Sequence, residues 1–127
     1  HLDAGMTEQG LRELGAADLD LAILENVGNL VCPAEFDTGA VKNVAILSVP
    51  EGHDKPLKYP LMFEVCQALI INKIDVLPYF DFNMDKVREF AHKRNPDIEI
   101  FPISAKTGEG VDAWCNWLEA QVRAWNE

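Results

Sequence analysis

The sequence predicts an α/β fold with a mostly parallel sheet flanked by helices. Short, largely continuous apolar segments recur along the chain, and such segments are typical of strands buried on both faces of a parallel sheet. Segments with apolar residues at helical spacing separate them, and strands that alternate with helices form βαβ units. No internal repeat, low-complexity tract or Gly/Ser-rich linker divides the 127 residues, so residues 1–127 are predicted to form a single domain.

Four apolar segments are the predicted strands. They are residues 19–25, 42–49, 68–72 and 98–104. In open α/β sheets, ligands bind at the carboxyl ends of the strands. We therefore expect the residues that follow these segments to form the functional site.

Four further segments are predicted to be helices. They are residues 3–14, 56–67, 83–94 and 110–125. Residues 56–67 begin with a proline, which suits the first helical position, although Pro60 must then also lie within the first turn. Residues 83–94 begin with Asn83, whose side chain can cap a helix, and end with basic residues that favour a helix C-terminus. Residues 110–125 carry an apolar stripe at helical spacing.

Charge and composition disfavour several classes of protein. The formal net charge is −10, whereas a nucleic-acid surface needs clustered cations. Three cysteines, at positions 32, 66 and 115, are too few and odd in number for a disulfide framework, which favours a reducing compartment. No basic-then-apolar leader opens the chain, and no apolar segment approaches membrane-spanning length. We expect a cytoplasmic protein that binds neither nucleic acid nor membrane.

The strongest functional signal is the string Asn72-Lys73-Ile74-Asp75, at the end of the third predicted strand. Guanine presents a ring N–H and an exocyclic amine side by side, and the carboxylate of Asp75 can accept from both. Asn72 can hydrogen-bond the O6/N7 edge and link neighbouring loops, and the aliphatic stem of Lys73 can lie across the base. The string therefore predicts a guanine site.

A second string, Ser104-Ala105-Lys106, follows the fourth predicted strand. Its backbone is expected to bring an N–H towards O6 of guanine, where adenine carries an amine instead. A mismatched base leaves buried donors or acceptors unpaired, so such a site rejects it strongly. Each string alone is compatible with a polar turn, but their order and shared position predict guanine recognition.

An acid and a glycine, Glu25 and Gly28, follow the first predicted strand. In a nucleotide hydrolase, an acid at this place helps to hold Mg²⁺, and the glycine N–H meets the γ-phosphate where a side chain would block approach. Aspartate is the commoner acid there, and an isolated acid before a turn more often has a structural role. Beside a guanine site, the two residues predict Mg²⁺ binding by Glu25 and γ-phosphate sensing by Gly28.

The sequence contains no G-x-x-x-x-G-K-[ST] string, the loop whose backbone and lysine cradle nucleotide phosphates. Lys106 and Thr107 do not supply it, because the glycines come after them. The residues therefore predict guanine recognition and leave hydrolysis by this chain alone open.

His1 and Cys32 are reasonable ligands for Zn²⁺ or Ni²⁺. Cys32 comes shortly after Gly28, so a metal held there would respond to the state of the nucleotide. From these residues alone the simpler interpretation is a terminal histidine without a defined role and a cysteine that serves as a small hydrophobic residue.

Several longer strings occur together in this chain and point to one family. They are, in order, His1-Leu2-Asp3-Ala4, Glu25-Asn26-Val27-Gly28-Asn29-Leu30-Val31-Cys32-Pro33, Glu51-Gly52 through Pro60, Asn72-Lys73-Ile74-Asp75 with Leu77-Pro78-Tyr79, and Asn95-Pro96 followed by Ser104 to Gly110. Over essentially its whole length, the chain resembles the C-terminal two-thirds of the HypB family, the nickel-incorporation GTPases of hydrogenase maturation.

The resemblance implies a P-loop NTPase-type fold that here lacks its N-terminal P-loop strand, and hence a single but partial GTPase domain. It implies a GTP-binding metallochaperone that uses Mg²⁺ and couples GTP hydrolysis to nickel insertion during [NiFe] hydrogenase maturation. It also implies a homodimer whose partners are another hydrogenase maturation protein and the hydrogenase large subunit.

The resemblance further implies a Ni²⁺ or Zn²⁺ site made by a Cys-His pair and a second cysteine, shared across the dimer. His1 matches the histidine and Cys32 the second cysteine, whereas the first cysteine would precede His1 and is not in the sequence. Asp3 matches an acid of the switch region near Mg²⁺.

A competing hypothesis is a non-hydrolytic metal-binding or docking module with the same fold, which the absence of a P-loop string favours. A third is a general guanine-nucleotide switch without a metal role, and the strings around Cys32 count against it.

Overall fold

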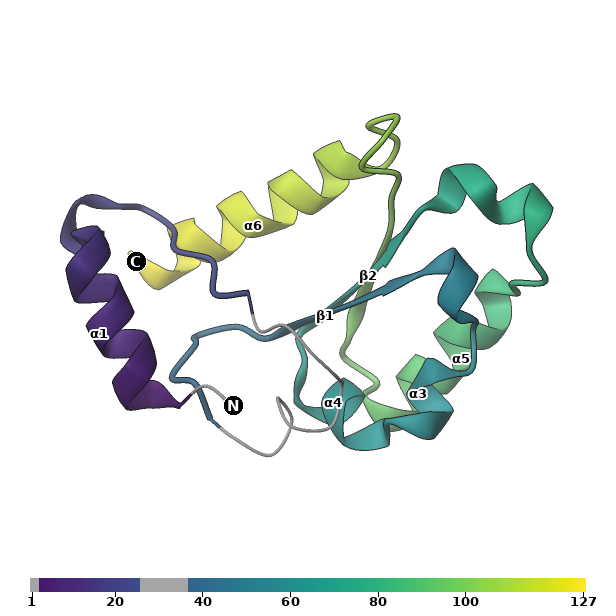
Figure 1. The fold of residues 1–127 in the computed structure, drawn as a ribbon, viewed down its shortest axis with the longest axis horizontal. Helices are drawn as coiled ribbons and strands as arrows, with labels where there is room; N and C mark the ends of the chain where they lie inside the picture. Colours follow the sequence, from purple (N-terminus) through teal and green to yellow (C-terminus); the bar gives the residue numbers. More distant parts are fainter. Residues whose placement is uncertain (1–2, 26–36) are drawn as a thin grey trace.

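A three-stranded parallel sheet lies at the centre of the computed structural model, which describes residues 3–25 and 37–127 (Figure 1). The strands are β1 (Val44–Ser48), β2 (Ala68–Asn72) and β3 (Glu99–Pro102), in the spatial order β1-β2-β3. β2 pairs in parallel with both neighbours, with Ile70 opposite Ile46 on one side and Phe101 on the other. The predicted α/β fold is confirmed, and three of the four predicted strands form, two of them shorter than expected.

Helices connect the strands and cover the sheet. They are α1 (Ala4–Leu14), α3 (Lys55–Lys58), α4 (Pro60–Val65), α5 (Met84–Arg94) and α6 (Val111–Trp125), with 3-10 turns η1 (Ala16–Asp18), η2 (Val49–Glu51) and η3 (Ile74–Tyr79). In Figure 1, α3, α4 and α5 lie on one side of the sheet and α6 lies on the other. Within residues 3–25 and 37–127, no helix combines the length and the hydrophobicity needed to span a membrane.

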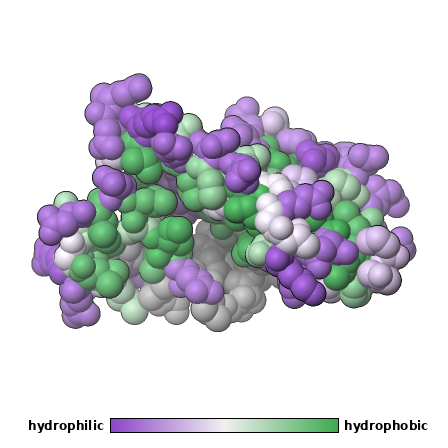
Figure 2. All heavy atoms as spheres, turned by 90° about the horizontal axis from the view of Figure 1, so that it is seen from above, coloured by the Kyte–Doolittle hydropathy of each residue, from purple (hydrophilic) through white to green (hydrophobic). Residues whose placement is uncertain are grey.

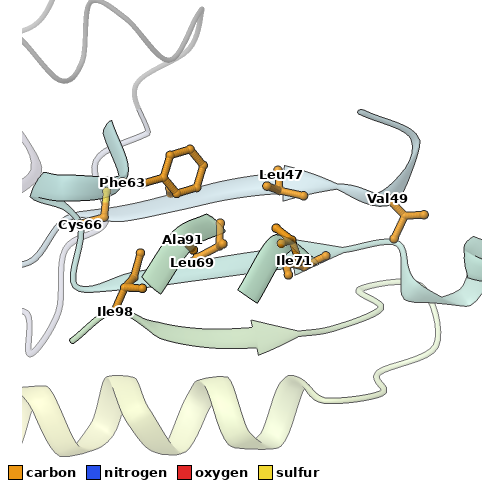
Figure 3. Close-up of a cluster of buried hydrophobic side chains, with 10 residues drawn as sticks. Leu47, Val49, Phe63, Cys66, Leu69, Ile71, Ala91 and Ile98 are labelled. Carbon is orange, nitrogen blue, oxygen red and sulfur yellow. The ribbon is translucent and has the colours of Figure 1, made fainter. Parts of the chain in front are cut away.

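The main core lies between the sheet and the helices α4 and α5. Alternate strand residues such as Leu47, Leu69 and Ile71 point to the side of the sheet that also carries Phe63 of α4 and Ala91 of α5 (Figure 3). All five side chains are almost fully buried. Burial of one such large apolar side chain contributes about 1.5–3 kcal/mol, so this layer is the main stabilising element of the fold.

The opposite face of the sheet is covered only in part. Phe101 of β3 packs against two tryptophans of α6, with its ring centroid 5.4 Å from that of Trp114 and 5.9 Å from that of Trp117. Ile46 lies on this face of β1 and remains 56 % exposed. α6 therefore covers the β3 side of this face and leaves the β1 side open.

Residues 19–25 do not form the predicted strand. None of the three strands pairs with this segment, and an apolar segment becomes a buried strand only where neighbours bind its backbone and cover its side chains. Its hydrophobic residues lie at the surface instead, with Ile23 77 % exposed. In the space-filling view of Figure 2, hydrophobic side chains are exposed on the side of the molecule that carries α1.

The predicted helix over residues 56–67 is in fact two short helices, α3 and α4. α3 ends before Tyr59, whose backbone lies outside the helical region at φ −128° and ψ 60°, and α4 begins at Pro60. Proline disfavours a helical conformation in the preceding residue and has no N–H for an internal helical hydrogen bond. Pro60 therefore starts a new helix and does not continue the first turn of the old one.

The other predicted helices are confirmed, and two of them are capped by their own side chains. Asn83 accepts a hydrogen bond from the Lys86 N–H at 3.1 Å at the start of α5, and Asp3 accepts one from the Met6 N–H at 2.9 Å at the start of α1. Such caps satisfy backbone donors that have no partner within the helix.

We expect Cys66 to make stability depend on pH above about pH 9. Burial raises the pKa of the Cys66 thiol to about 12. The thiol of the unfolded chain ionises at lower pH, so the unfolded state releases its proton first and the free energy of unfolding falls as pH rises towards 12, by about 1.4 kcal/mol per pH unit.

Denaturant unfolding between pH 8 and 11 tests this expectation. Cys66→Ala should show a weaker dependence on pH than the parent, whereas Cys115→Ala, which changes an exposed cysteine, should match the parent. If the free energy of unfolding of the parent and of Cys66→Ala changed equally with pH, the raised pKa of Cys66 would be contradicted.

Candidate functional site

The two predicted base-reading strings lie together at the carboxyl edge of the sheet. Asn72 is the last residue of β2, and Ser104 follows β3 by two residues. Backbone hydrogen bonds join the two segments just beyond the strands: the Ile103 N–H donates to the Ile71 carbonyl at 2.8 Å, and the Ile74 N–H donates to the Ile103 carbonyl at 3.2 Å. In Figure 1 the turn after β2 and the loop before α6 lie at the same end of the sheet.

A partly buried hydrogen bond between Ser104 and Asp75 lies at the base of this site. The Ser104 side chain is fully buried, and its Oγ donates to Asp75 Oδ1 at 2.9 Å. Ser104 Oγ also accepts a hydrogen bond from the Thr107 N–H at 3.1 Å, so the hydroxyl acts both as a donor and as an acceptor. One carboxylate oxygen of Asp75 is thereby fixed in direction, and the group keeps acceptor capacity for a ligand.

Asn72 links the two strings as predicted. Its Oδ1 accepts from the Ala105 N–H at 3.1 Å, which leaves the side-chain NH₂ as a donor. A donor at this place suits the O6/N7 edge of guanine, which carries two acceptors. The bond also modifies one expectation, because the Ala105 N–H already has a partner and a base carbonyl would have to share or replace it.

Lys73 has the left-handed backbone conformation, with φ 64° and ψ 36°. Among the described residues it is the only one other than glycine with a positive φ, and this conformation is costly for a lysine. The left-handed turn ends β2 and starts η3, the turn that carries Asp75 next to Ser104. Its side chain is exposed, as is that of Lys106, so both lysines lie at the rim of the site.

The arrangement can therefore distinguish bases by hydrogen bonding. The Asp75 carboxylate, held by a buried hydroxyl, and the Asn72 amide are both half-buried at this edge, and Lys73 and Lys106 are exposed. Guanine offers two adjacent donors and an acceptor edge that complement these groups, whereas adenine offers an amine where the site requires an acceptor.

The remaining predicted site residues are placed only in part. His1, Gly28 and Cys32 lie outside the described residues. Glu25 is exposed at the end of residues 3–25. Asp3 uses Oδ1 to cap α1, a structural role that the sequence did not reveal. Within the described part of the chain, no group of three His, Cys, Asp or Glu side chains is arranged to hold a metal ion.

Sequence reasoning missed one further element at this edge of the sheet. The carboxylate of Glu51 accepts from the Ser48 N–H at 2.7 Å and from Ser48 Oγ at 2.9 Å, where β1 passes into η2. The spacing Ser-x-x-Glu is the signature of a capping box, so the printed sequence contained the signal. These two bonds hold the turn that follows β1, at the same edge of the sheet as the two predicted base-reading strings after β2 and β3.

Comparison with known proteins agrees with this geometry. Residues 2–102 match the family described as "CobW/HypB/UreG, nucleotide-binding domain". The chain belongs to the CobW/HypB/UreG family. The parallel sheet is thus part of a nucleotide-binding domain.

The similar relatives are hydrogenase maturation factors of the HypB type. The chain is 52 % identical over 121 residues to "Hydrogenase maturation factor HypB" of Escherichia coli K12. The aligned region covers 95 % of this chain and 42 % of that protein. It is 43 % identical over 127 residues to "Hydrogenase/urease maturation factor HypB" of Helicobacter pylori J99, covering 97 % of this chain and 52 % of that protein. The chain thus spans about half, or somewhat less, of the length of these relatives.

Solved structures of HypB proteins share the fold. HypB of Helicobacter pylori in complex with nickel superposes with a TM-score of 0.89 at 42 % identity, covering 98 % of this chain and 60 % of that one. HypB of Archaeoglobus fulgidus gives a TM-score of 0.86 at 37 % identity, covering 94 % of this chain and 63 % of that one. The P-loop NTPase-type fold class predicted from the sequence is therefore confirmed.

We expect Asn72 to control the backbone of the second string even without a ligand. Asn72→Ala removes the acceptor of the Ala105 N–H, and loss of one such bond corresponds to roughly 1 kcal/mol, or about a fivefold faster local opening. Asn72→Asp places a carboxylate oxygen where the amide oxygen was, so the Ala105 amide should retain its protection from exchange. Hydrogen exchange of the Ala105 amide, followed by NMR, measures the effect, and an unchanged rate in Asn72→Ala would show that the bond does not restrain the loop.

Proposed function

We propose that this chain serves in a GTP-binding metallochaperone that couples GTP hydrolysis to nickel insertion during [NiFe] hydrogenase maturation. The observation that carries the proposal is the hydrogen bond from the buried Ser104 hydroxyl to Asp75, beside Asn72, at the joined ends of two parallel strands. The identity of about half the residues to proteins named hydrogenase maturation factors supports the same role.

Recognition of GTP would begin with the base. Asp75 accepts from the ring N–H and the exocyclic amine, and Asn72 donates to the O6/N7 edge. Lys73 lies along one face of the ring with its aliphatic stem, as its exposed position at the rim allows. Because Ser104 is fully buried and already bonded to Asp75, the carboxylate is oriented before the base arrives, which lowers the cost of binding.

The phosphate side of the nucleotide would be read by Glu25 and Gly28, with Asp3 as a further acid. Mg²⁺ prefers oxygen ligands, and both acids supply carboxylates. Asp3 caps α1 through Oδ1, so Oδ2 is the oxygen that would face the ion or its water shell. Mg²⁺, when bound, would neutralise charge that develops on the phosphate oxygens. Gly28 would offer its N–H to the γ-phosphate and thereby report whether GTP or GDP is present.

Nickel would be the cargo, bound by His1 and Cys32, and Zn²⁺ would compete for the same ligands. An imidazole nitrogen and a thiolate suit both ions. Two side chains do not complete a four-coordinate site, so a homodimer that pairs two copies of these ligands would complete it. Cys32 follows Gly28 by four positions in the sequence, which would let the γ-phosphate change metal affinity.

The expected partners follow from the same role. The metal would pass from or to another hydrogenase maturation protein and on to the hydrogenase large subunit, in the cytoplasm. The formal charge of −10 suits binding to metal cations or to a basic protein surface and disfavours nucleic acid.

We predict that Asp75→Asn exchanges the base preference of this chain. The amide of asparagine replaces one acceptor with a donor, so binding of GTP should weaken by about 10-fold to 100-fold because a buried donor is left unpaired. Xanthosine triphosphate, which carries a carbonyl in place of the amine, should bind better to the variant than to the parent. Calorimetric titration of both nucleotides measures the effect, with Asp97→Asn, an exposed acid before β3, as the matched control. Equal affinities of parent and variant for GTP would refute the placement of the base.

We predict that Cys32→Ala lowers the affinity for Ni²⁺ and for Zn²⁺ without changing the fold. Cys115→Ala, which removes an exposed thiol on α6, is the matched control and should leave metal binding unchanged. Titration with each metal and circular dichroism of the metal-free variants measure the two effects. Overlapping titrations of parent and Cys32→Ala would exclude this ligand. Metal binding without any GTP turnover would favour a non-hydrolytic metal-binding module.

A further inference from the structure

The backbone passes unusually close to itself at Gly110, the residue that precedes α6. A Cβ atom at this position would overlap the carbonyl oxygen of Pro102 and would lie 3.3 Å from Cα and from Cγ2 of Ile103. Gly110 also has a φ of 76°, in the left-handed region. Both the space and the conformation therefore require glycine here.

A second glycine of the same loop, Gly108, has the left-handed backbone conformation of Gly110 but not its close backbone contact. Gly108 has a φ of 86°, yet nothing lies within 4 Å of a Cβ built on it. Alanine at Gly108 would meet conformational strain alone, whereas alanine at Gly110 would meet strain and a collision with the end of β3. The pair offers a matched comparison within one loop.

A series of hydrogen bonds connects the residue before Gly110 with Ser104 and Asp75. The Ser104 N–H donates to the carbonyl of Glu109, the neighbour of Gly110, at 2.9 Å, and the Gly108 N–H donates to the Ser104 carbonyl at 2.8 Å. Ser104 Oγ then holds Asp75 Oδ1 at 2.9 Å. A displacement of Gly110 would move the Glu109 carbonyl, and with it the serine that orients Asp75.

A shift of α6 cannot easily relieve the collision. Trp114 stands one helical turn after Gly110 and packs on Phe101 of β3 at 5.4 Å between ring centroids. Trp117, one turn further, contacts the same ring at 5.9 Å. Because these contacts fix the first turns of α6 against β3, a side chain at Gly110 would have to displace the loop of residues 104–109.

We propose that Gly110 is a positioning residue for guanine recognition: its close approach to Pro102 and Ile103 sets Ser104 and, through Ser104, the carboxylate of Asp75. The proposal rests on the proposed guanine-binding function and adds a determinant of base selectivity outside both base-reading strings.

Binding of guanosine diphosphate and inosine diphosphate to Gly110→Ala and Gly108→Ala tests the proposal. Inosine diphosphate lacks the exocyclic amine that Asp75 accepts, so the ratio of the two affinities reports the orientation of the carboxylate. Gly110→Ala should weaken guanosine diphosphate binding by about 10-fold or more and bring the ratio close to one. Gly108→Ala should lose less affinity and keep the preference of the parent.

Ser104→Ala removes a single oxygen atom and creates no steric overlap, so it provides a second variant in case Gly110→Ala fails to fold. If Gly110 acts through Ser104, Ser104→Ala must also lose the preference for guanosine diphosphate, and full retention of that preference would overturn the proposal. Equal losses in the two glycine variants would overturn it as well, because strain alone would then explain them. In both cases the guanine site of the parent stands. A parent that does not prefer guanosine over inosine diphosphate would instead refute the proposed function, and the role of Gly110 with it.

Discussion

β2 pairs in parallel with β1 on one side and with β3 on the other, and its first four residues are buried. It is the central strand of the sheet, and both of the other strands are placed by pairing with it. Leu69 and Ile71 of β2 point to the face that carries α4 and α5, and the other face of the strand lies on the side of the sheet that carries α6. Its last residue, Asn72, delivers the first base-reading string to the edge where β3 delivers the second. Packing of the core and the placement of Asn72 next to Ala105 therefore depend on the same five residues.

Polar groups at this edge are arranged from the inside outward. The serine hydroxyl is buried and fully bonded, the aspartate and asparagine are half-buried, and the two lysines are exposed. A neutral hydroxyl at the base of the site orients the carboxylate without neutralising it, so its charge is available to a ligand. Selectivity in such a site comes from donors and acceptors that have no alternative partner, and a surface cluster of the same residues would not provide it.

The sequence predicted those parts of the fold that local chemistry decides. β2 forms over the predicted residues 68–72, and α5 begins after its predicted cap, Asn83. Residues 19–25 were wrongly predicted as a strand because an apolar segment does not reveal whether a neighbour exists to pair with it. The Ser104–Asp75 bond joins residues 29 positions apart, so the strings predict a role for Asp75 in base recognition but do not reveal the bond that holds its carboxylate. The steric role of Gly110 depends on a close backbone contact with the end of β3, and local sequence patterns do not show such a contact either.

The bonds that close the site span long stretches of chain: 29 residues separate Ser104 from Asp75, and 33 separate Ala105 from Asn72. Contacts of such long range gain free energy only after the entropy of closing the intervening loop has been overcome, which α5 and the pairing of β3 accomplish. Bonds between residues this far apart therefore depend on the intervening chain, which returns through α5 and β3. In a polypeptide growing on the ribosome, neither bond can form before Ser104 and Ala105 have emerged, so Asp75 and Asn72 lack these partners until then.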